Sequence, residues 1–496
     1  MKSKLLILLL LVVMVFSACN GTADVSDTPS QGGEVSEKSE SSLPEAESTP
    51  VESEPEESVP EESEPVESVP EESEPEESTP AEESTSPETS TAPETSAPAE
   101  ESKDEVVNEC RVTVKFCRFS EKPYAVVLGK CDEGATITLT CGNKTYTSES
   151  WHGWYSVRFL CTASKAEVTI TQKINGKQVG YALETTVYPK AAGTSEGVVA
   201  GGNFQFFYQK CLRDFQHTNL YNAGLLDNLK TRVAGRISTL KKANLDTEII
   251  YMVVPAAMTV YPELVPEQYE QGKGDSRMDQ VLDTLSAAGA TVIDLRTAFE
   301  EHKNDEYPLY FKTDSHWTDY GAFIAYQELF NHISKSFPEA APRSFEEFNW
   351  KGDFYKSGDM PVYLNMISGS IYENGKITNS DILEYGWYRT FDKSVSVDKK
   401  ITSVPRYRAD VQMVYSPEVT GEYTFNTGRS ELPSCMVMHD SFGTQIFDIL
   451  AERMDTTVYP AMWDYTYKAS TVSTKKLDYV IYILAEWNLD EIVYKN

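Results

Sequence analysis

Three features are missing from this chain of 496 residues, and each absence argues against a class of protein. Basic residues form no cluster, and 44 Lys and Arg stand against 77 Asp and Glu, which argues against a nucleic-acid-binding protein. There is no HExxH motif and no pair of CxxC units, so the sequence predicts no metal site. No apolar run reaches the roughly 20 residues that a membrane-spanning helix needs.

The N-terminus has the pattern of an export signal. Two lysines precede the apolar stretch Leu5–Phe16, and Ser17-Ala18-Cys19 follow. A basic start, a short apolar run and a small-residue cleavage site are typical of a signal peptide. The four residues FSAC resemble a bacterial lipobox, although leucine is commoner than phenylalanine at its first position. We therefore expect residues 1–19 to be a lipoprotein signal peptide, with a lipid on Cys19 that anchors the protein to the extracellular face of the membrane. Ordinary secretion and a retained membrane helix are the alternatives.

Residues 20–105 consist largely of Glu, Ser, Pro and Thr, with imperfect repeats such as EESEPEES. They contain 28 acidic residues and two lysines, and therefore carry −26 of the chain's net charge of −33. Such a segment buries too little apolar surface to offset its ordering entropy, and its charge and proline extend it. We expect a disordered acidic linker that holds the following domains away from the membrane.

Residues 106–192 are expected to form a small all-β module, a β-sandwich of immunoglobulin type. β-Branched and aromatic residues are concentrated in short runs separated by turn-forming residues. The predicted strands are Arg111–Phe116, Ala135–Thr140, Trp154–Leu160 and Ala166–Gln172. Of the seven cysteines after Cys19, five lie between residues 110 and 161. Export permits disulfides, but the spacing does not reveal a pairing, and an odd number leaves one unpaired in a monomer.

Residues 195–496 alternate helical and strand patterns, which favours an α/β sandwich. The predicted strands are Glu248–Val254, Thr291–Leu295, Cys435–Met438 and Tyr479–Leu484. The last is a continuous apolar run, as expected when both faces of a parallel sheet are covered. The predicted helices are most of Phe207–Ala243, Met278–Ala288, a helix after Thr318 with a stripe from Ala322 to Ile333, and Gln445–Met454.

Two short motifs, TDSHWT at Thr313–Thr318 and HDSFG at His439–Gly443, indicate a serine-type acyl-transfer site. Serine is a weak nucleophile unless a base removes its proton, and a carboxylate orients that base. Ser441 follows a predicted strand, and a helix is expected to begin at about Gly443, where free backbone N–H groups suit an oxyanion. Gly443 would let the backbone turn tightly. Alternatively, Asp440 or Ser441 only caps the helix.

Asp314 and His316 are the candidate acid and base. They are two residues apart, so in an extended segment their side chains point the same way. A carboxylate that accepts the Nδ1–H of His316 fixes its tautomer and leaves Nε2 to face Ser441. Asp-x-His also occurs by chance on solvated surfaces. Trp317 is expected to stack on a sugar or to pack in the core, and His439 to line the site. The candidates for substrate or oxyanion contacts are Asp440, Gly443, Trp317 and His439.

Four stretches of residues 195–496 resemble one known family. They are VVPAAMTVYPELVP at Val253–Pro266, the run from IDLRTAF at Ile293 through TDSHWT to Ala322, HDSFG at His439–Gly443, and YVIYILAEWNL at Tyr479–Leu489. Together they are similar to the AlgX/AlgJ and DHHW group of SGNH-hydrolase-like proteins, which are exported bacterial proteins of polysaccharide O-acetylation. The resemblance implies a circularly permuted SGNH fold, a three-layer sandwich in which the Asp-x-His block precedes the serine.

By that resemblance Ser441 is the nucleophile, His316 the base and Asp314 its orienting acid. A polysaccharide acceptor and a membrane-bound O-acyltransferase that supplies acetyl groups are the implied partners, and no cofactor is implied. The chain departs from its relatives at His439, where glycine is frequent, and at Trp487, where arginine is frequent. Alginate is therefore not implied as the substrate.

We thus predict serine-dependent acetyl transfer to a cell-surface or secreted polysaccharide. A carbohydrate acetyl esterase of the same fold is the nearest alternative, because water in place of the sugar turns transfer into hydrolysis. A non-catalytic wall-binding or polysaccharide-binding lipoprotein is a second alternative, and it would not require Ser441.

Overall fold

The computed structural model describes residues 109–191, 197–356, 358–360, 364, 383–391 and 423–494. The signal peptide, the lipidation site and the acidic linker expected at residues 1–105 lie outside the described residues. Internal contacts divide the chain after Pro98, and every described residue belongs to the second unit. Within the described ranges, no helix combines the length and the apolar character that are needed to cross a bilayer.

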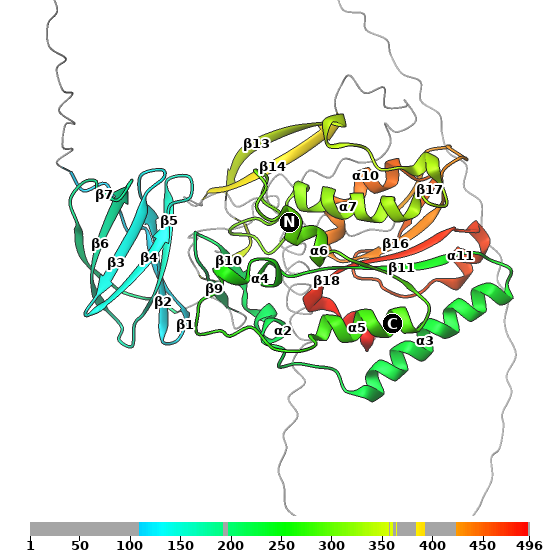
Figure 1. Cartoon of the computed structure of the whole chain (residues 1–496), viewed down its shortest axis with the longest axis horizontal. Coiled ribbons are helices and arrows are strands. Elements are labelled where there is room, and N and C mark those ends of the chain that lie inside the picture. The colour runs from blue at the N-terminus through cyan, green and yellow to red at the C-terminus, as the bar shows by residue number, and fades with distance from the viewer. Residues whose placement is uncertain are drawn as a thin grey trace, which may run out of the picture. The chain divides into compact units, whose positions relative to one another are not determined.

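The N-terminal module consists of two antiparallel sheets (Figure 1). One sheet has the order β1 (Phe116–Glu121), β2 (Tyr124–Lys130), β5 (Trp154–Leu160). The other has the order β4 (Lys144–Glu149), β3 (Thr136–Cys141), β6 (Ala166–Ile174), β7 (Lys177–Gln178), and β8 (Leu183–Val187) also pairs with β6. Buried side chains from both sheets, among them Val127, Ile137, Phe159 and Ile170, form one core. The prediction of an all-β module is therefore supported by its strands.

Not every predicted strand of this module is correct. The run Trp154–Leu160 is confirmed as β5, and two further predictions agree with β3 and β6 within one or two residues at each end. The prediction of a strand at Arg111–Phe116 is wrong, because β1 begins only at Phe116. The backbone N–H groups of Thr113 and Lys115 still donate to carbonyls of β2, so the chain continues along the sheet edge without a regular ladder. All seven cysteines of the described residues are unpaired.

The α/β domain is built on a six-stranded sheet (Figure 1). Its order is β12 (Thr291–Asp294), β11 (Glu248–Val254), β18 (Tyr479–Ala485), β16 (Cys435–His439), β17 (Thr456–Tyr459), β15 (Tyr423–Asn426). All neighbours are parallel except β15 and β17. Every residue of β16 and β18 is buried, because these central strands are covered on both faces. Because β11, β18 and β16 are parallel, their carboxyl ends lie at one edge of the sheet.

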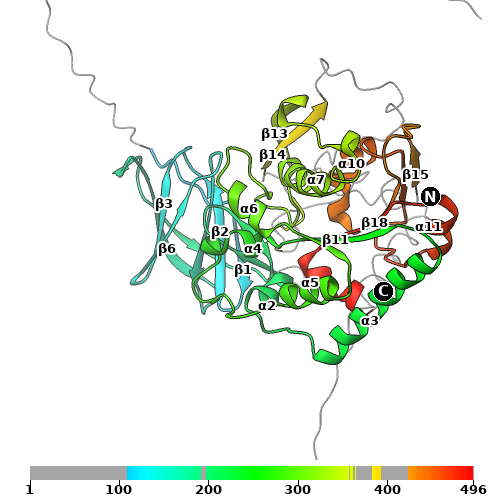
Figure 2. The same ribbon diagram turned by 45° about the vertical axis from the view of Figure 1, so that its right-hand side comes forward.

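Helices cover both faces of this sheet, which makes three layers. Alternate residues of each central strand face two separate apolar cores: Ile250 and Ile481 face the first, and Tyr251 and Tyr482 face the second. The first core includes residues of α6 (Arg296–His302), α7 (Asp319–Ile333) and α10 (Phe447–Glu452). The second includes residues of α3 (Ala223–Lys242), α5 (Arg277–Ala287), α11 (Ala469–Lys475) and α12 (Asp490–Val493). In Figures 1 and 2, α7 and α10 lie on one side of β11 and β18, and α3 and α5 lie on the other.

Further elements lie among the described residues. They are β9 (Val198–Ala200), β10 (Phe206–Tyr208), β13 (Phe348–Lys356), β14 (Leu383–Phe391), α2 (Leu212–Phe215) and α4 (Ala257–Val260), with the 3-10 turns η1 (Gln209–Cys211), η2 (Pro262–Leu264), η3 (Pro338–Ala340), η4 (Phe345–Glu347), η6 (Ser441–Gln445) and η7 (Glu486–Asn488). The expectation of a mostly helical Phe207–Ala243 is only partly correct. After α2 the chain leaves the helical conformation, and α3 starts afresh where the Asn222 side chain accepts the N–H of Leu225.

A small apolar core joins the β-module to the loops that precede the site. It includes Trp154 of β5, Phe204 before β10, Phe206 of β10, and Met360 from the chain beyond β13. The ring of Trp151 stacks on Phe204 with centroids 5.1 Å apart. The β-module therefore packs against residues next to the Asp314–His316 loop, because the Phe206 N–H donates to the Lys312 carbonyl at 2.8 Å and the Met360 N–H to the Thr313 carbonyl at 3.1 Å.

Candidate active site

Ser441 lies in a turn that Asp440 holds at the carboxyl edge of the sheet. β16 ends at His439, and Ser441 is the first residue of η6. The buried Asp440 carboxylate accepts the Phe442 N–H on Oδ1 at 2.9 Å. Its Oδ2 accepts the Ala485 N–H and the Asn488 side-chain N–H, both at 2.8 Å. Asp440 thereby ties the turn to the end of β18 and is buried away from solvent.

The turn at Ser441 differs from the predicted one in two respects: where the following helix begins, and why position 443 is glycine. The helix expected from Gly443 is wrong, because η6 intervenes and α10 begins only at Phe447. The Gly443 N–H donates to the Asp440 carbonyl at 3.1 Å, so it is not free. Gly443 does not adopt a positive φ. Instead, a Cβ at this position would come within 2.6 Å of His439 Cβ, so the close packing requires glycine. The Ser441 N–H has no acceptor among the described residues, which leaves it available to an oxyanion.

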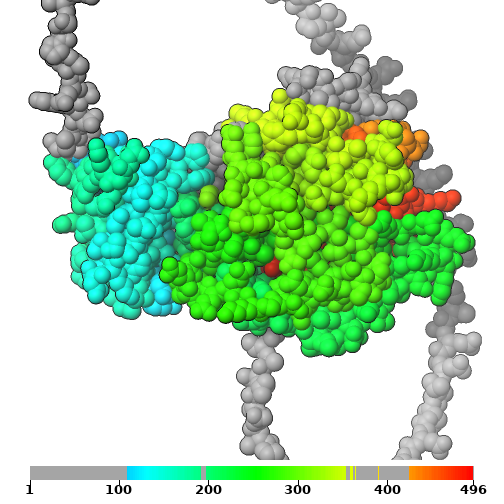
Figure 3. Space-filling model, in the orientation of Figure 1, coloured from blue at the N-terminus to red at the C-terminus, as the bar shows by residue number. Residues whose placement is uncertain are grey.

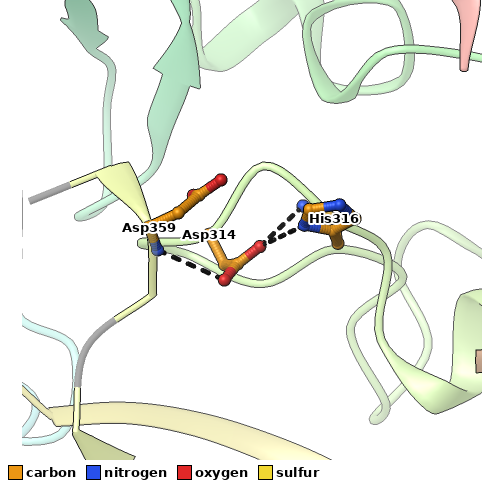
Figure 4. Close-up of side chains that lie close together, drawn as sticks. All are labelled: Asp314, His316 and Asp359. Atoms are coloured by element: carbon orange, nitrogen blue, oxygen red, sulfur yellow. Dashed lines mark hydrogen bonds and ion pairs between the residues drawn. The ribbon is translucent and has the colours of Figure 1, made fainter. Parts of the chain in front are cut away.

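The structure brings Asp314, His316 and Ser441 into one hydrogen-bonded chain. His316 Nδ1 lies 2.6 Å from Asp314 Oδ1, and His316 Nε2 lies 2.8 Å from Ser441 Oγ. All three residues are buried, with at most 9% of their surface exposed. The loop is held by a bridge between Tyr310 and Trp317, and α7 begins directly after it. Figure 4 shows Asp314 between the His316 ring and Asp359.

The charges of Asp314 and His316 stabilise one another. Burial works against ionisation of both groups, but the neighbouring charge and the mutual hydrogen bonds outweigh it. The pKa of Asp314 is therefore lowered and the pKa of His316 is raised. Such a pair holds the Nδ1–H of His316 toward Asp314 and presents Nε2 to Ser441, so His316 can accept the serine proton.

Asp359 is a component of the site that sequence reasoning missed. Its carboxylate accepts the Ser315 N–H at 2.9 Å and the Ser315 hydroxyl at 2.7 Å. Its own N–H donates to Asp314 Oδ2 at 3.2 Å (Figure 4). Burial, together with the Asp314 charge, raises the pKa of Asp359 to about 7. No local pattern marks this residue, because it lies 45 positions after Asp314.

The other sequence-predicted residues are internal. Trp317 is fully buried, and its Nε1–H donates to the Phe442 carbonyl at 3.0 Å, which ties the two motifs together. His439 is also buried, and its Nδ1 lies 2.7 Å from the Asp440 carbonyl. Its ring packs edge-on against Phe447. Burial lowers the pKa of His439 and favours the neutral ring.

Asp314, His316 and Asp359 also place possible metal-ligand atoms within 4.8 Å of one another. A His316 ring that donates its Nδ1–H to Asp314 presents no lone pair there to an ion, and its other nitrogen faces Ser441. The Asp359 oxygens accept two hydrogen bonds from Ser315. The donor set thus fits proton transfer better than metal binding.

Comparisons with known proteins agree with this architecture. Residues 207–378 match the family model of the SGNH hydrolase-like domain of acetyltransferase AlgX. That range includes Asp314 and His316 and ends before Ser441. A probable alginate O-acetylase AlgJ of Azotobacter vinelandii is 25% identical over 154 residues, which are 31% of this chain and 37% of that protein. The chain thus spans little more than a third of this curated relative.

Two solved structures are also similar. The O-acetyltransferase domain of Pseudomonas putida AlgJ aligns with a TM-score of 0.37 and 18% identity, over 60% of this chain and 93% of that one. A DHHW family protein from Eubacterium siraeum aligns with a TM-score of 0.38 and 15% identity, over 65% and 94%. The C-terminal domain has the SGNH-like α/β fold. The resemblance to the AlgX/AlgJ-like family, stated from the sequence, is confirmed.

Proposed function

We propose that this protein is a serine-dependent O-acetyltransferase that acts on a polysaccharide, with Ser441, His316 and Asp314 as its catalytic triad. The continuous hydrogen-bonded chain from Asp314 through His316 to Ser441 carries this proposal, with steps of 2.6 and 2.8 Å. The AlgX-type match and the similarity to an alginate O-acetylase support acetyl transfer as the family-level reaction.

In the proposed reaction, Ser441 Oγ attacks the carbonyl carbon of an acetyl donor while His316 Nε2 takes its proton. The Ser441 N–H donates to the oxyanion of the tetrahedral intermediate. The intermediate collapses, the leaving group receives the proton from His316, and the acetyl group remains on Oγ. A sugar hydroxyl then attacks this ester and gives its proton to His316. The bond between the acetyl carbon and Ser441 Oγ breaks, His316 returns the proton to Oγ, and the acetylated sugar leaves. Asp314 stabilises the imidazolium in both halves of the cycle.

Acetyl release from p-nitrophenyl acetate tests the role of Ser441. The full chain, kept in detergent, is compared with Ser441→Ala and with the control Ser473→Ala, whose serine lies exposed on α11. We expect Ser441→Ala to fall to the uncatalysed rate and the control to match the native chain. Equal rates for the native chain and Ser441→Ala would refute catalysis by Ser441. They would favour the alternative of a non-catalytic polysaccharide-binding protein. With a glycan acceptor present, mass spectrometry separates acetylated sugar from free acetate, and acetate alone would identify an esterase.

The finer assignments belong to the same proposal. We infer a circularly permuted SGNH arrangement, supported by the Asp-x-His loop preceding the serine turn along the chain, and an immunoglobulin-like module within residues 106–192 before the enzyme domain at 195–496. We also infer a lipid-anchored extracellular protein, supported by the lipobox-like FSAC sequence, and an acetyl donor delivered by a membrane-bound O-acyltransferase. Labelling cells with a radioactive fatty acid tests the anchor: Cys19→Ala should abolish incorporation.

A further inference from the structure

A cavity of about 550 Å³ opens at the same sheet edge but is not lined by the proposed triad. Residues that follow β12, β11 and β18 form its walls, including Arg296, Thr259 and Glu486, and Phe215 of α2 adds an aromatic face. The carboxyl ends of parallel strands are where ligand sites of open α/β sheets form. The volume lies within the range of roughly 300–1,000 Å³ that is usual for ligand pockets. In Figure 3, a few red atoms from the C-terminal part of the chain are visible in a recess between green segments.

The cavity lies next to the Ser441 turn through two direct contacts. Asp440, the residue before Ser441, accepts the N–H of Ala485, and Glu486 is the next residue. The rings of Phe442 and Trp487, the residues after Ser441 and Glu486, have centroids 5.2 Å apart. The cavity wall at Glu486 is therefore joined to the nucleophile turn by a backbone hydrogen bond and a ring contact of the adjoining residues.

Two polar groups that line the cavity each keep one atom without a hydrogen-bond partner among the described residues. Glu486 is 2% exposed, and its Oε2 accepts the Ala256 N–H at 2.7 Å and the Thr259 hydroxyl at 2.8 Å. Its Oε1 accepts no hydrogen bond from the described part of the chain. The Nδ1 atom of His217 is buried and likewise has no partner there. The His217 Nδ1 atom is covered by protein. Glu486 Oε1 is therefore the acceptor of this wall that a polar ligand can use.

The charge of the lining restricts the ligand. Five carboxylates line the cavity against a single cationic group, Arg296. Asp214 and Asp279 are already engaged with Arg277 and Arg296. The others are Glu486 on the wall and the exposed side chains of Glu300, which pairs with Lys303 at 3.0 Å, and Glu301. Such a field repels a uronate and favours a neutral or cationic ligand that is rich in hydroxyl groups.

We propose that this cavity binds one unit of a neutral or amino sugar, as the subsite that holds the acceptor glycan. Carboxylate oxygens accept hydrogen bonds from sugar hydroxyl or ammonium groups, and the Phe215 ring covers an apolar face. Naming the sugar as the acceptor rests on the proposed acetyl transfer, whereas the binding itself does not. A hexosamine or N-acetylhexosamine polymer is therefore favoured over a polyuronate.

Binding is measured by calorimetry on the full chain bearing Ser441→Ala, so that no turnover occurs. The probes are tetramers of N-acetylglucosamine, of glucosamine and of galacturonic acid. We expect the first two to bind and the third to bind at least about tenfold more weakly. Equal or tighter binding of the uronate, or no binding of either amino-sugar tetramer, would overturn the proposal. Neither result bears on Ser441-dependent acetyl release, which is measured separately.

Variants locate the binding in the cavity. Glu486→Gln keeps an acceptor for the Ala256 N–H but removes the charge, and should weaken glucosamine tetramer binding about tenfold. Asp227→Asn, on the exposed face of α3, is the matched control and should change nothing. Replacing Glu300 and Glu301 by lysine should reverse the preference toward the uronate. If Glu486→Gln and the double lysine variant both bind the glucosamine tetramer as tightly as the parent chain, with unchanged melting temperatures, the sugar binds elsewhere.

Discussion

Replacing Asp359 tests whether the Asp314–His316 loop must be clamped for catalysis. Asp359→Ala removes both acceptors of the Ser315 N–H and hydroxyl. Hydrogen bonds to charged groups contribute about 1.5–3 kcal/mol each, and Ser315 is half-buried, so we expect a loss of about 2–3 kcal/mol in unfolding free energy. Ser315 lies between the acid and the base, and a displacement of the base by about 1 Å lowers the rate roughly 100-fold.

Asp359→Asn separates geometry from charge. An asparagine side chain can accept the Ser315 N–H and donate to the Ser315 hydroxyl, as the protonated acid would. We therefore expect it to restore most of the kcat lost in Asp359→Ala, with KM little changed in both. Ionised Asp359 raises the pKa of His316, so the acidic limb of the kcat profile should move to lower pH in the asparagine variant.

The assay is acetyl release over a range of pH, with circular dichroism to verify folding. Native kcat in a folded Asp359→Ala protein would refute the positioning argument. An asparagine variant as slow as the alanine variant, with an unmoved acidic limb, would refute it as well.

Three other predictions concern the site and its surroundings. Asp314→Asn should lower kcat roughly 10³–10⁴-fold and, by removing the charge that raises the pKa of His316, should move the acidic limb of the pH–rate profile downward. Gly358→Ala places a Cβ 2.4 Å from Asp314 Cβ and from a backbone oxygen, so denaturant melts should show that the free energy of unfolding falls by about 1–3 kcal/mol. The control Gly235→Ala, on α3, adds its Cβ to open space and should raise the free energy of unfolding by up to about 1 kcal/mol. Burial raises the pKa of Glu486 from 4.5 to about 7, so its favourable contribution to stability is complete below about pH 4.5 and is lost as the pH rises through 7. Glu486→Gln should therefore flatten the fall in unfolding free energy over that range, and an unchanged slope would contradict the assignment.

Local patterns predicted four strands of the six-stranded sheet well and the strands of the β-module less well. Glu248–Val254 was predicted to the residue, because a buried parallel strand is a continuous apolar run bounded by polar residues and proline. β2 was not predicted, although it is largely buried. The predicted strand at Arg111–Phe116 has the right alternation but the wrong place, because β1 is set by its pairing with β2 across the sheet. Pairing between strands is a tertiary property that a local pattern does not contain.

The two motifs suggested an acid, a base and a nucleophile, but not the side chains that hold them. Asp440 was considered as a helix cap, and the structure shows it holding η6 to β18 through two further hydrogen bonds. Trp317 was expected either to stack on a sugar or to pack in the core, and it is in the core, with its indole N–H on the nucleophile turn. Both roles depend on residues more than 40 positions away.

The sequence by itself determined what is local: the acidic composition of residues 20–105, the alternation of strands and helices, and the Asp-x-His spacing that lets Asp314 meet His316. Only the tertiary structure decided that His316 lies 2.8 Å from Ser441, 125 residues further on. That contact exists because β18 pairs with β11 on one side and β16 on the other, which brings segments remote in the chain to one edge of the sheet. Asp359 and the cavity at Glu486 arise from the same assembly. Spacing along the chain does not encode them, because they depend on which strands become neighbours.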